Sequence, residues 1–91
     1  MSRFVRILDA SLREHYLERT AVLHVARAHT NWRQLPRLEI VYMATRSDQH
    51  MLREALEFAP QSITLTFPDV KRREACYDRL AAICAQNAED V

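Results

Sequence analysis

The alternation of apolar and polar residues divides the chain into short predicted strands and helices. Residues 4–8, Phe-Val-Arg-Ile-Leu, are typical of a short strand. Residues 38–44, Leu-Glu-Ile-Val-Tyr-Met-Ala, are apolar on both faces apart from Glu39, which predicts a central strand. Residues 62–67 alternate apolar side chains with threonine and serine, the pattern of a strand with one exposed face.

Two later segments have the spacing of amphipathic helices. The first begins at Ser47 or Asp48, carries an apolar residue every three or four positions, and is closed by Pro60. The second follows Pro68 and Asp69 and continues to about residue 85, with the tail 86–91 expected to fray. Its expected buried side chains are Cys76, Tyr77, Leu80, Ile83 and Cys84.

Residues 11–30 allow two interpretations. Ser11 and Glu14 have the spacing of a capping box, which predicts that a helix begins here. We favour its continuation to about residue 30, because Ala21, Ala26, Ala28 and the arginines are good helix formers. The resulting order β-α-β-α-β-α predicts a small α/β fold, a largely parallel sheet covered by helices. In the alternative, the helix stops near Glu18 and residues 20–27, which are rich in β-branched side chains, form a strand. The order is then β-α-β-β-α-β-α, an α+β fold with an antiparallel sheet and helices on one face.

The length sets the scale of the domain. Residues 1–91 are enough for a single domain with a thin core, which leaves homo-oligomerisation open. No apolar run has the length of a signal peptide or a membrane span, so we expect no membrane partner. The expected location is the cytoplasm, or the host cytoplasm if the gene is viral.

The chain contains no glycine. Loops that cradle phosphate groups need glycine, because the backbone must approach the ligand closely and adopt positive φ. Walker A and dinucleotide-binding fingerprints are therefore excluded, together with the Gly-x-Ser-x-Gly nucleophile elbow.

Other catalytic and metal-binding patterns are weak. His24 and His29 are five residues apart, which places them on different faces of a helix, and there is no Cys-x-x-Cys pair. Cys76 and Cys84 lie on the apolar stripe of the last helix, as expected for reduced core thiols. We therefore predict no catalytic residue, no metal and no cofactor, with an enzyme of unfamiliar type as an alternative.

Charge is divided unequally along the chain. Residues 1–37 carry seven arginines and three acidic residues, a net +4, whereas residues 38–91 carry six basic and nine acidic residues, a net −3. The only tryptophan lies in the basic part, where no acidic residue occurs between Glu18 and Glu39. Tryptophan and arginine are enriched in binding hot spots, and together they also stack on unpaired bases. The residues expected to bind a partner are Trp32, Arg33, Arg37, Arg27, His29 and Asn31.

A second basic patch is expected at Lys71, Arg72 and Arg73, in the first turn of the last helix, where the helix dipole disfavours cations. An anion or an acidic partner would explain this placement. The function that we expect is a non-enzymatic protein-binding regulator, adaptor or inhibitor, of a size common among phage and bacterial proteins. The alternative is a nucleic-acid-binding protein that uses the arginine and tryptophan patch.

Overall fold

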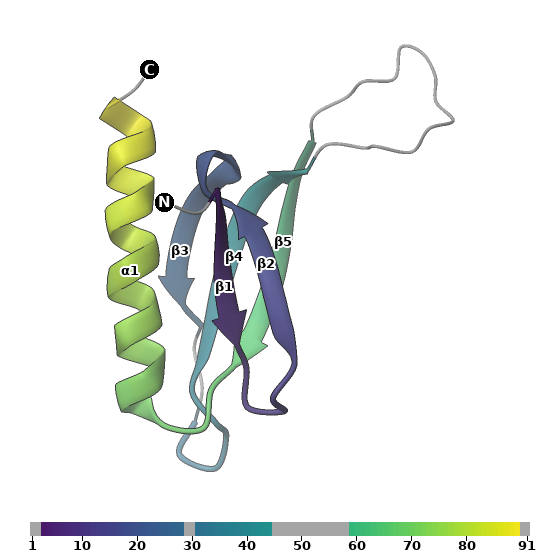
Figure 1. Cartoon of the computed structure of the whole chain (residues 1–91). Helices are drawn as coiled ribbons and strands as arrows, with labels where there is room; N and C mark the ends of the chain where they lie inside the picture. Colours follow the sequence, from purple (N-terminus) through teal and green to yellow (C-terminus); the bar gives the residue numbers. More distant parts are fainter. Residues whose placement is uncertain (1–2, 29–30, 45–58, 90–91) are drawn as a thin grey trace.

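The computed structural model describes residues 3–28, 31–44 and 59–89 of the chain (Figure 1). It is a mixed α+β domain with two antiparallel sheets and one C-terminal helix. The elements follow one another as β1 (Phe4–Leu8), β2 (Glu14–Glu18), a 3-10 turn (Arg19–Ala21), β3 (Val22–Arg27), β4 (Arg37–Ala44), β5 (Ala59–Thr66) and α1 (Val70–Glu89). Strands β1 and β2 form one sheet, and β3, β4 and β5 form the other with β4 in the centre.

Asp9 organises the turn of the β1–β2 hairpin. Its Oδ1 atom accepts the backbone N–H groups of Ser11 at 2.9 Å and Arg13 at 3.0 Å. Its Oδ2 atom lies 2.9 Å from Nε2 of His15, and this contact is the main reason why the pKa of Asp9 is lowered. The turn places Leu12 at a φ of 65° without glycine. The hydrogen bonds to the Asp9 carboxylate thus stabilise a tight turn of the kind that usually contains glycine.

A β-bulge shapes the three-stranded sheet. Val22 is opposite Tyr42 and His24 is opposite Val41, so Leu23 is an extra residue in β3. Because of this insertion, Val22 and Val25 both point into the core although they are three residues apart. The bulge therefore gives a strand the apolar spacing that is normally typical of a helix.

The core lies where the hairpin, the larger sheet and α1 meet (Figure 1). Helix α1 runs alongside β3, with which it makes most of its contacts, and it buries Cys76, Leu80 and Ile83. The hairpin contributes Val5 and Ile7 from β1. The remaining buried side chains of the cluster are Val22, Val25, Leu38, Ile40, Leu65 and Phe67. None of the three units could bury its apolar face without the other two.

The favoured order β-α-β-α-β-α and its parallel sheet are wrong. Residues 11–30 contain no α-helix in their described part; they form the turn at Asp9, then β2, a 3-10 turn and β3. Pairing with β1 decides the conformation of β2, because it buries Val5 and Ile7 on the same side as the half-buried Leu17. The alternative was right about an antiparallel sheet and an α+β class, and its strand at 20–27 is confirmed for Val22–Arg27. It was wrong about the helix before this strand, and Thr20 and Ala21 belong to the 3-10 turn.

The other sequence expectations have mixed outcomes. Strands at 4–8 and 38–44 and the last helix are confirmed, and 62–67 lies almost wholly in β5. Pro60, expected to end a helix, lies inside β5, which is an edge strand that tolerates a residue without an N–H group. The helix expected from Ser47 or Asp48 falls on residues 45–58, outside the described residues. Residues 86–89, expected to fray, are helical, and the Asn87 side chain donates to the carbonyl groups of Arg19 and Val22 at 2.9 Å.

No helix within the described ranges is long and apolar enough to cross a membrane. Both cysteines are free thiols, as expected, with Cys76 buried and Cys84 partly buried.

The junction at Leu80 gives a first testable prediction. Leu80 has no exposed surface and belongs to the core cluster that joins the hairpin, the larger sheet and α1. Replacing it by Ala should lower the free energy of unfolding by about 2–5 kcal/mol, because a cavity forms where the sheets and the helix meet. Urea denaturation followed by circular dichroism measures this loss. The exposed Gln86→Ala variant of the same helix is the matched control, and an equal loss in both variants would contradict the assignment of the core.

Candidate binding surfaces

The loop between β3 and β4 holds the tryptophan on a well-defined turn. The side-chain oxygen of Asn31 accepts the N–H group of Arg33 at 2.9 Å, and its backbone oxygen accepts the N–H group of Gln34 at 3.1 Å. The Gln34 side chain accepts in return the N–H group of Asn31 at 3.0 Å. These three bonds hold the backbone on both sides of Trp32 in a turn.

Trp32 is 84% exposed and therefore does not cap the core. The guanidinium of Arg33 lies over its ring, 4.6 Å from the centroid, in cation–π geometry. Leu35 adds a second exposed apolar side chain to the same loop. We name the segment 31–36 the Trp32 loop.

The structure gathers only some of the residues that were predicted to act together. Asn31, Trp32 and Arg33 share the Trp32 loop, as described above. Arg37 lies half-buried at the start of β4, and His29 lies outside the described residues. Arg27 belongs elsewhere, because its Nε atom donates to Glu74 at 2.9 Å and its guanidinium lies 4.0 Å from the centre of the Tyr77 ring.

Glu74 is the centre of an ion-pair cluster between α1 and β3. It accepts from Arg27 of β3 and, at 3.0 Å, from Arg73 of its own helix. The bond from Arg27 lowers the pKa of Glu74 to about 2, with a further contribution from Arg73. The same bond raises the pKa of Arg27. The cluster holds α1 against β3. Arg27 and Arg73 therefore stabilise the fold, and a partner would have to compete with Glu74 for them.

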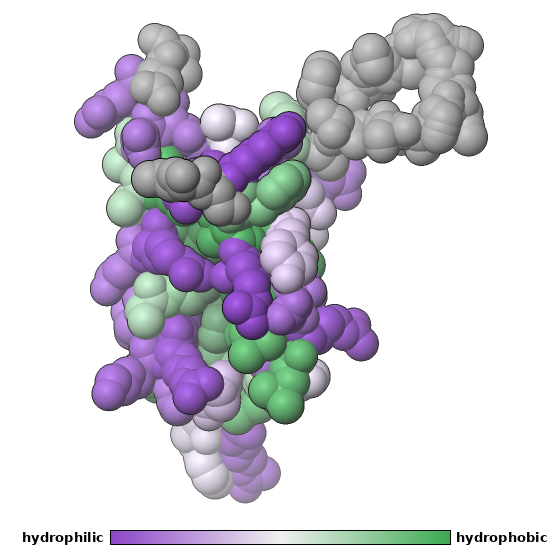
Figure 2. Space-filling model, in the orientation of Figure 1, coloured by the Kyte–Doolittle hydropathy of each residue, from purple (hydrophilic) through white to green (hydrophobic). Residues whose placement is uncertain are grey.

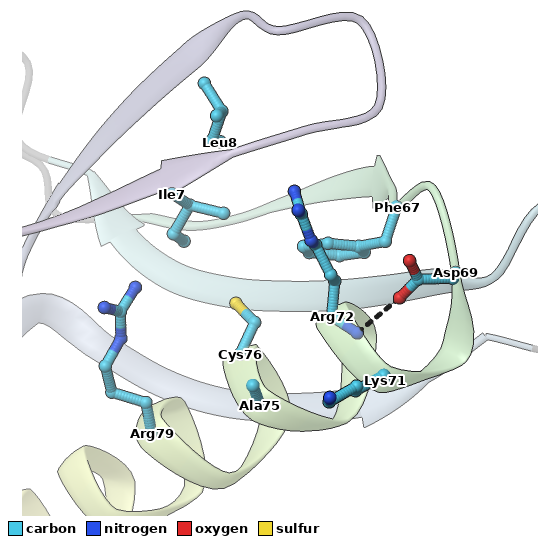
Figure 3. Close-up of a pocket in the computed structure, with 9 residues that line it drawn as sticks. All are labelled: Ile7, Leu8, Phe67, Asp69, Lys71, Arg72, Ala75, Cys76 and Arg79. Carbon is cyan, nitrogen blue, oxygen red and sulfur yellow. Dashed lines mark hydrogen bonds between the residues drawn. The ribbon is translucent and has the colours of Figure 1, made fainter.

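A groove opens between β1 and α1 (Figure 3). Its larger part has a volume of about 770 Å³, and a second part of about 400 Å³ continues it along β1. Leu8 and Arg79 line both parts. The floor of the larger part consists of Ile7, Phe67 and Cys76, all buried members of the core. We name this feature the β1–α1 groove.

Cations line the helical side of the β1–α1 groove. Lys71, Arg72 and Arg79 all belong to its larger part, and the side chains of both arginines rise from α1 toward β1 (Figure 3). One acidic residue, Asp69, also lines it and accepts the backbone N–H group of Arg72 at 2.8 Å, which caps the helix. The predicted basic patch is thereby divided: Lys71 and Arg72 face the groove, whereas Arg73 turns to Glu74.

The strand side of the groove is a backbone edge. Arg19 N–H donates to Arg3 C=O and Asp9 N–H donates to Arg13 C=O, so odd-numbered residues of β1 bond to β2. Arg6 and Leu8 therefore direct their N–H and C=O groups away from β2. Arg79 donates to the carbonyl of Arg6 at 2.8 Å, which shows that this edge faces the helix.

The sequence did not reveal the open edge of β1. This edge exists only because the folded chain places α1, and no further strand, on the side of β1 away from β2. Arg79 was also missed. A sequence signal for it existed, since positions 72 and 79 are seven residues apart and share one face of a helix. On the face of the molecule seen in Figure 2, hydrophilic side chains cover most of the helix, in agreement with this charged surface.

The described residues provide little for covalent or metal chemistry. Burial raises the pKa of the Cys76 and Cys84 thiols, the opposite of what a thiolate nucleophile requires. Within the described ranges, no three His, Cys, Asp or Glu side chains are grouped as metal ligands.

Comparison of the chain with protein-family models, with curated proteins and with solved structures gives no match.

The ion-pair cluster gives the second prediction. The folded-state pKa of Glu74 lies below its ordinary value of 4.5, so its stabilisation is fully present above about pH 4.5 and is lost as the pH falls toward 2. Glu74→Gln should therefore destabilise the domain at neutral pH, and the difference from the wild type should shrink steadily on acidification. Denaturant unfolding at a series of pH values measures it. Glu39→Gln on the open face of the sheet is the control, and a difference that persists at pH 2 would contradict the assignment.

Proposed function

We propose that the chain is a non-enzymatic protein-binding module, a regulator, adaptor or inhibitor that docks through the Trp32 loop. The observation that carries this proposal is Trp32 itself, 84% exposed on a turn held by three hydrogen bonds. A partner that covers the ring removes on the order of 200 Å² from water, about 4–5 kcal/mol of hydrophobic driving force before the cost of association.

The order of the loop strengthens the argument. A backbone that already forms an ordered turn loses little further conformational entropy on binding, so more of the hydrophobic driving force becomes affinity. Arg33 on the ring and Leu35 nearby supply a cation and a second apolar contact, the mixture that is common at the centre of protein interfaces.

The positions of the arginines favour a protein partner over a nucleic acid. A nucleic-acid surface needs several cations that follow the phosphate backbone. Of the arginines predicted for this surface, Arg27 is bound to Glu74 and Arg37 is half-buried. Arg33 remains beside Trp32, and one cation gives little phosphate affinity.

Replacing Trp32 by Ala provides the third prediction. Capture of the partner from a lysate of the source organism should weaken at least about 30-fold, the loss typical of a hot spot worth about 2 kcal/mol. The melting temperature should stay within about 2 °C of the wild type, because the ring contributes nothing to the core. Quantitative mass spectrometry of proteins retained by each immobilised variant measures the first quantity, and differential scanning calorimetry measures the second.

Leu12→Ala is the matched control, since Leu12 is also an exposed apolar residue on a turn but lies at the tip of the other hairpin. The proposal fails if both variants retain the same proteins or if Trp32→Ala unfolds the domain. Titration with single-stranded oligonucleotides, followed by Trp32 fluorescence, tests the alternative. A response that disappears with added salt would replace the protein partner by a nucleic acid.

A further inference from the structure

We propose that the β1–α1 groove is a second binding site, which takes an extended acidic segment of a partner protein as an added strand on β1. This site is separate from the Trp32 loop and does not depend on it. Three features carry the inference: an open strand edge, a groove of suitable size beside it, and cations along its far wall.

The open edge lies at Leu8. Its backbone N–H and C=O groups point away from β2, and no hydrogen-bond partner for them is present among the described residues. The edge closes one step later, where Ala10 N–H donates to Thr66 C=O at 2.8 Å. At Arg6, the carbonyl is held by Arg79 rather than by another strand. Such an edge is the template that an extended peptide uses when it joins a sheet.

The groove has space for a short strand. An added strand lies about 4.8 Å from its neighbour, and five residues extend over about 17 Å. The two parts of the groove follow β1 from Phe4 to Leu8, which is five residues. Alternate side chains of the added strand would point to the apolar floor at Ile7 and Phe67 or outward to solvent. The occupant is therefore a segment of about five residues that alternates apolar and acidic side chains.

The charge of the groove selects the acidic side chains. Lys71, Arg72 and Arg79 line the helical wall, and the carboxylate of Asp69 is already engaged with a backbone N–H group. Arg79 now donates to a neutral carbonyl, and a carboxylate is the stronger acceptor. A peptide carboxylate would draw Arg79 from Arg6 and free that carbonyl for the incoming strand. Arg79, which lines both parts of the groove, would thus exchange the Arg6 carbonyl for a carboxylate of the peptide.

A peptide fits this site better than a nucleic acid does. The groove offers backbone groups along one wall, which a peptide can pair with and a phosphate backbone cannot. In the larger part, Phe67 is buried in the floor and presents no exposed ring on which a base could stack. In the smaller part, the half-exposed ring of Phe4 already lies beside the guanidinium of Arg3, 5.4 Å from the ring centroid.

The test uses the whole chain and a fluorescein-labelled octapeptide of alternating valine and glutamate. Fluorescence anisotropy should show binding of this peptide, and the Leu8 amide should shift in two-dimensional NMR and exchange its proton more slowly. Two matched peptides should not bind: one with lysine in place of glutamate, and one with N-methylated backbone amides. Arg79→Glu and Lys71→Glu should each weaken binding at least about tenfold.

Arg33→Glu is the control variant, because it makes the same change of charge in the Trp32 loop, and it should leave peptide binding unchanged. Lys71 is exposed at the start of α1, so Lys71→Glu remains informative if Arg79→Glu fails to fold. The proposal is overturned if the lysine or N-methylated peptide binds equally well, if the glutamate peptide does not bind, or if the Leu8 amide does not respond. Displacement of the peptide by oligothymidine from the same residues would assign the groove to phosphate instead. Trp32→Ala should leave binding of the octapeptide unchanged. The proposal for the groove and the proposal for the Trp32 loop can therefore fail independently of each other.

Discussion

The burial of one stripe of α1 between two small sheets holds this domain together. A two-stranded hairpin is marginal by itself in water, and a three-stranded sheet needs a cover for its apolar face. Cys76, Leu80 and Ile83 provide this cover for both, and Leu80 has no exposed surface at all. The buried side chains of the described residues form one cluster, so the features built on it depend on this contact.

The position of the helix also determines the exposed surfaces. Arg27 of β3 grips Glu74 and lies over Tyr77, which holds α1 against β3. The helix is therefore beside β3 rather than directly against β1, and the space left along β1 becomes a groove with a strand edge on one side. Arg79 bridges this space with a single hydrogen bond to a carbonyl. These contacts hold α1 in place and leave the edge of β1 at Leu8 without a neighbouring strand among the described residues.

The two surfaces proposed to bind partners differ in chemistry, although both belong to the same framework. The Trp32 loop exposes an aromatic ring beside a cation, the chemistry proposed for a protein partner. The β1–α1 groove is concave and cationic, and it suits an extended segment. Both lie on a scaffold whose buried residues take no part in either surface except as the floor of the groove, so changes in one surface need not disturb the other.

By itself, the sequence determined the parts whose pattern is local: the strand at β1, the central strand β4, most of β5, and α1 with its two free cysteines. It also singled out Trp32 and the basic start of α1 before any geometry was available. Only the tertiary structure decided residues 11–28, where the bulge at Leu23 gives a strand helical spacing and pairing with β1 overrides a capping-box pattern. The division of the arginines was likewise invisible in the sequence. Whether an arginine grips Glu74, stacks on Trp32 or lines a groove depends on neighbours as many as 73 residues away, which are brought close only by folding.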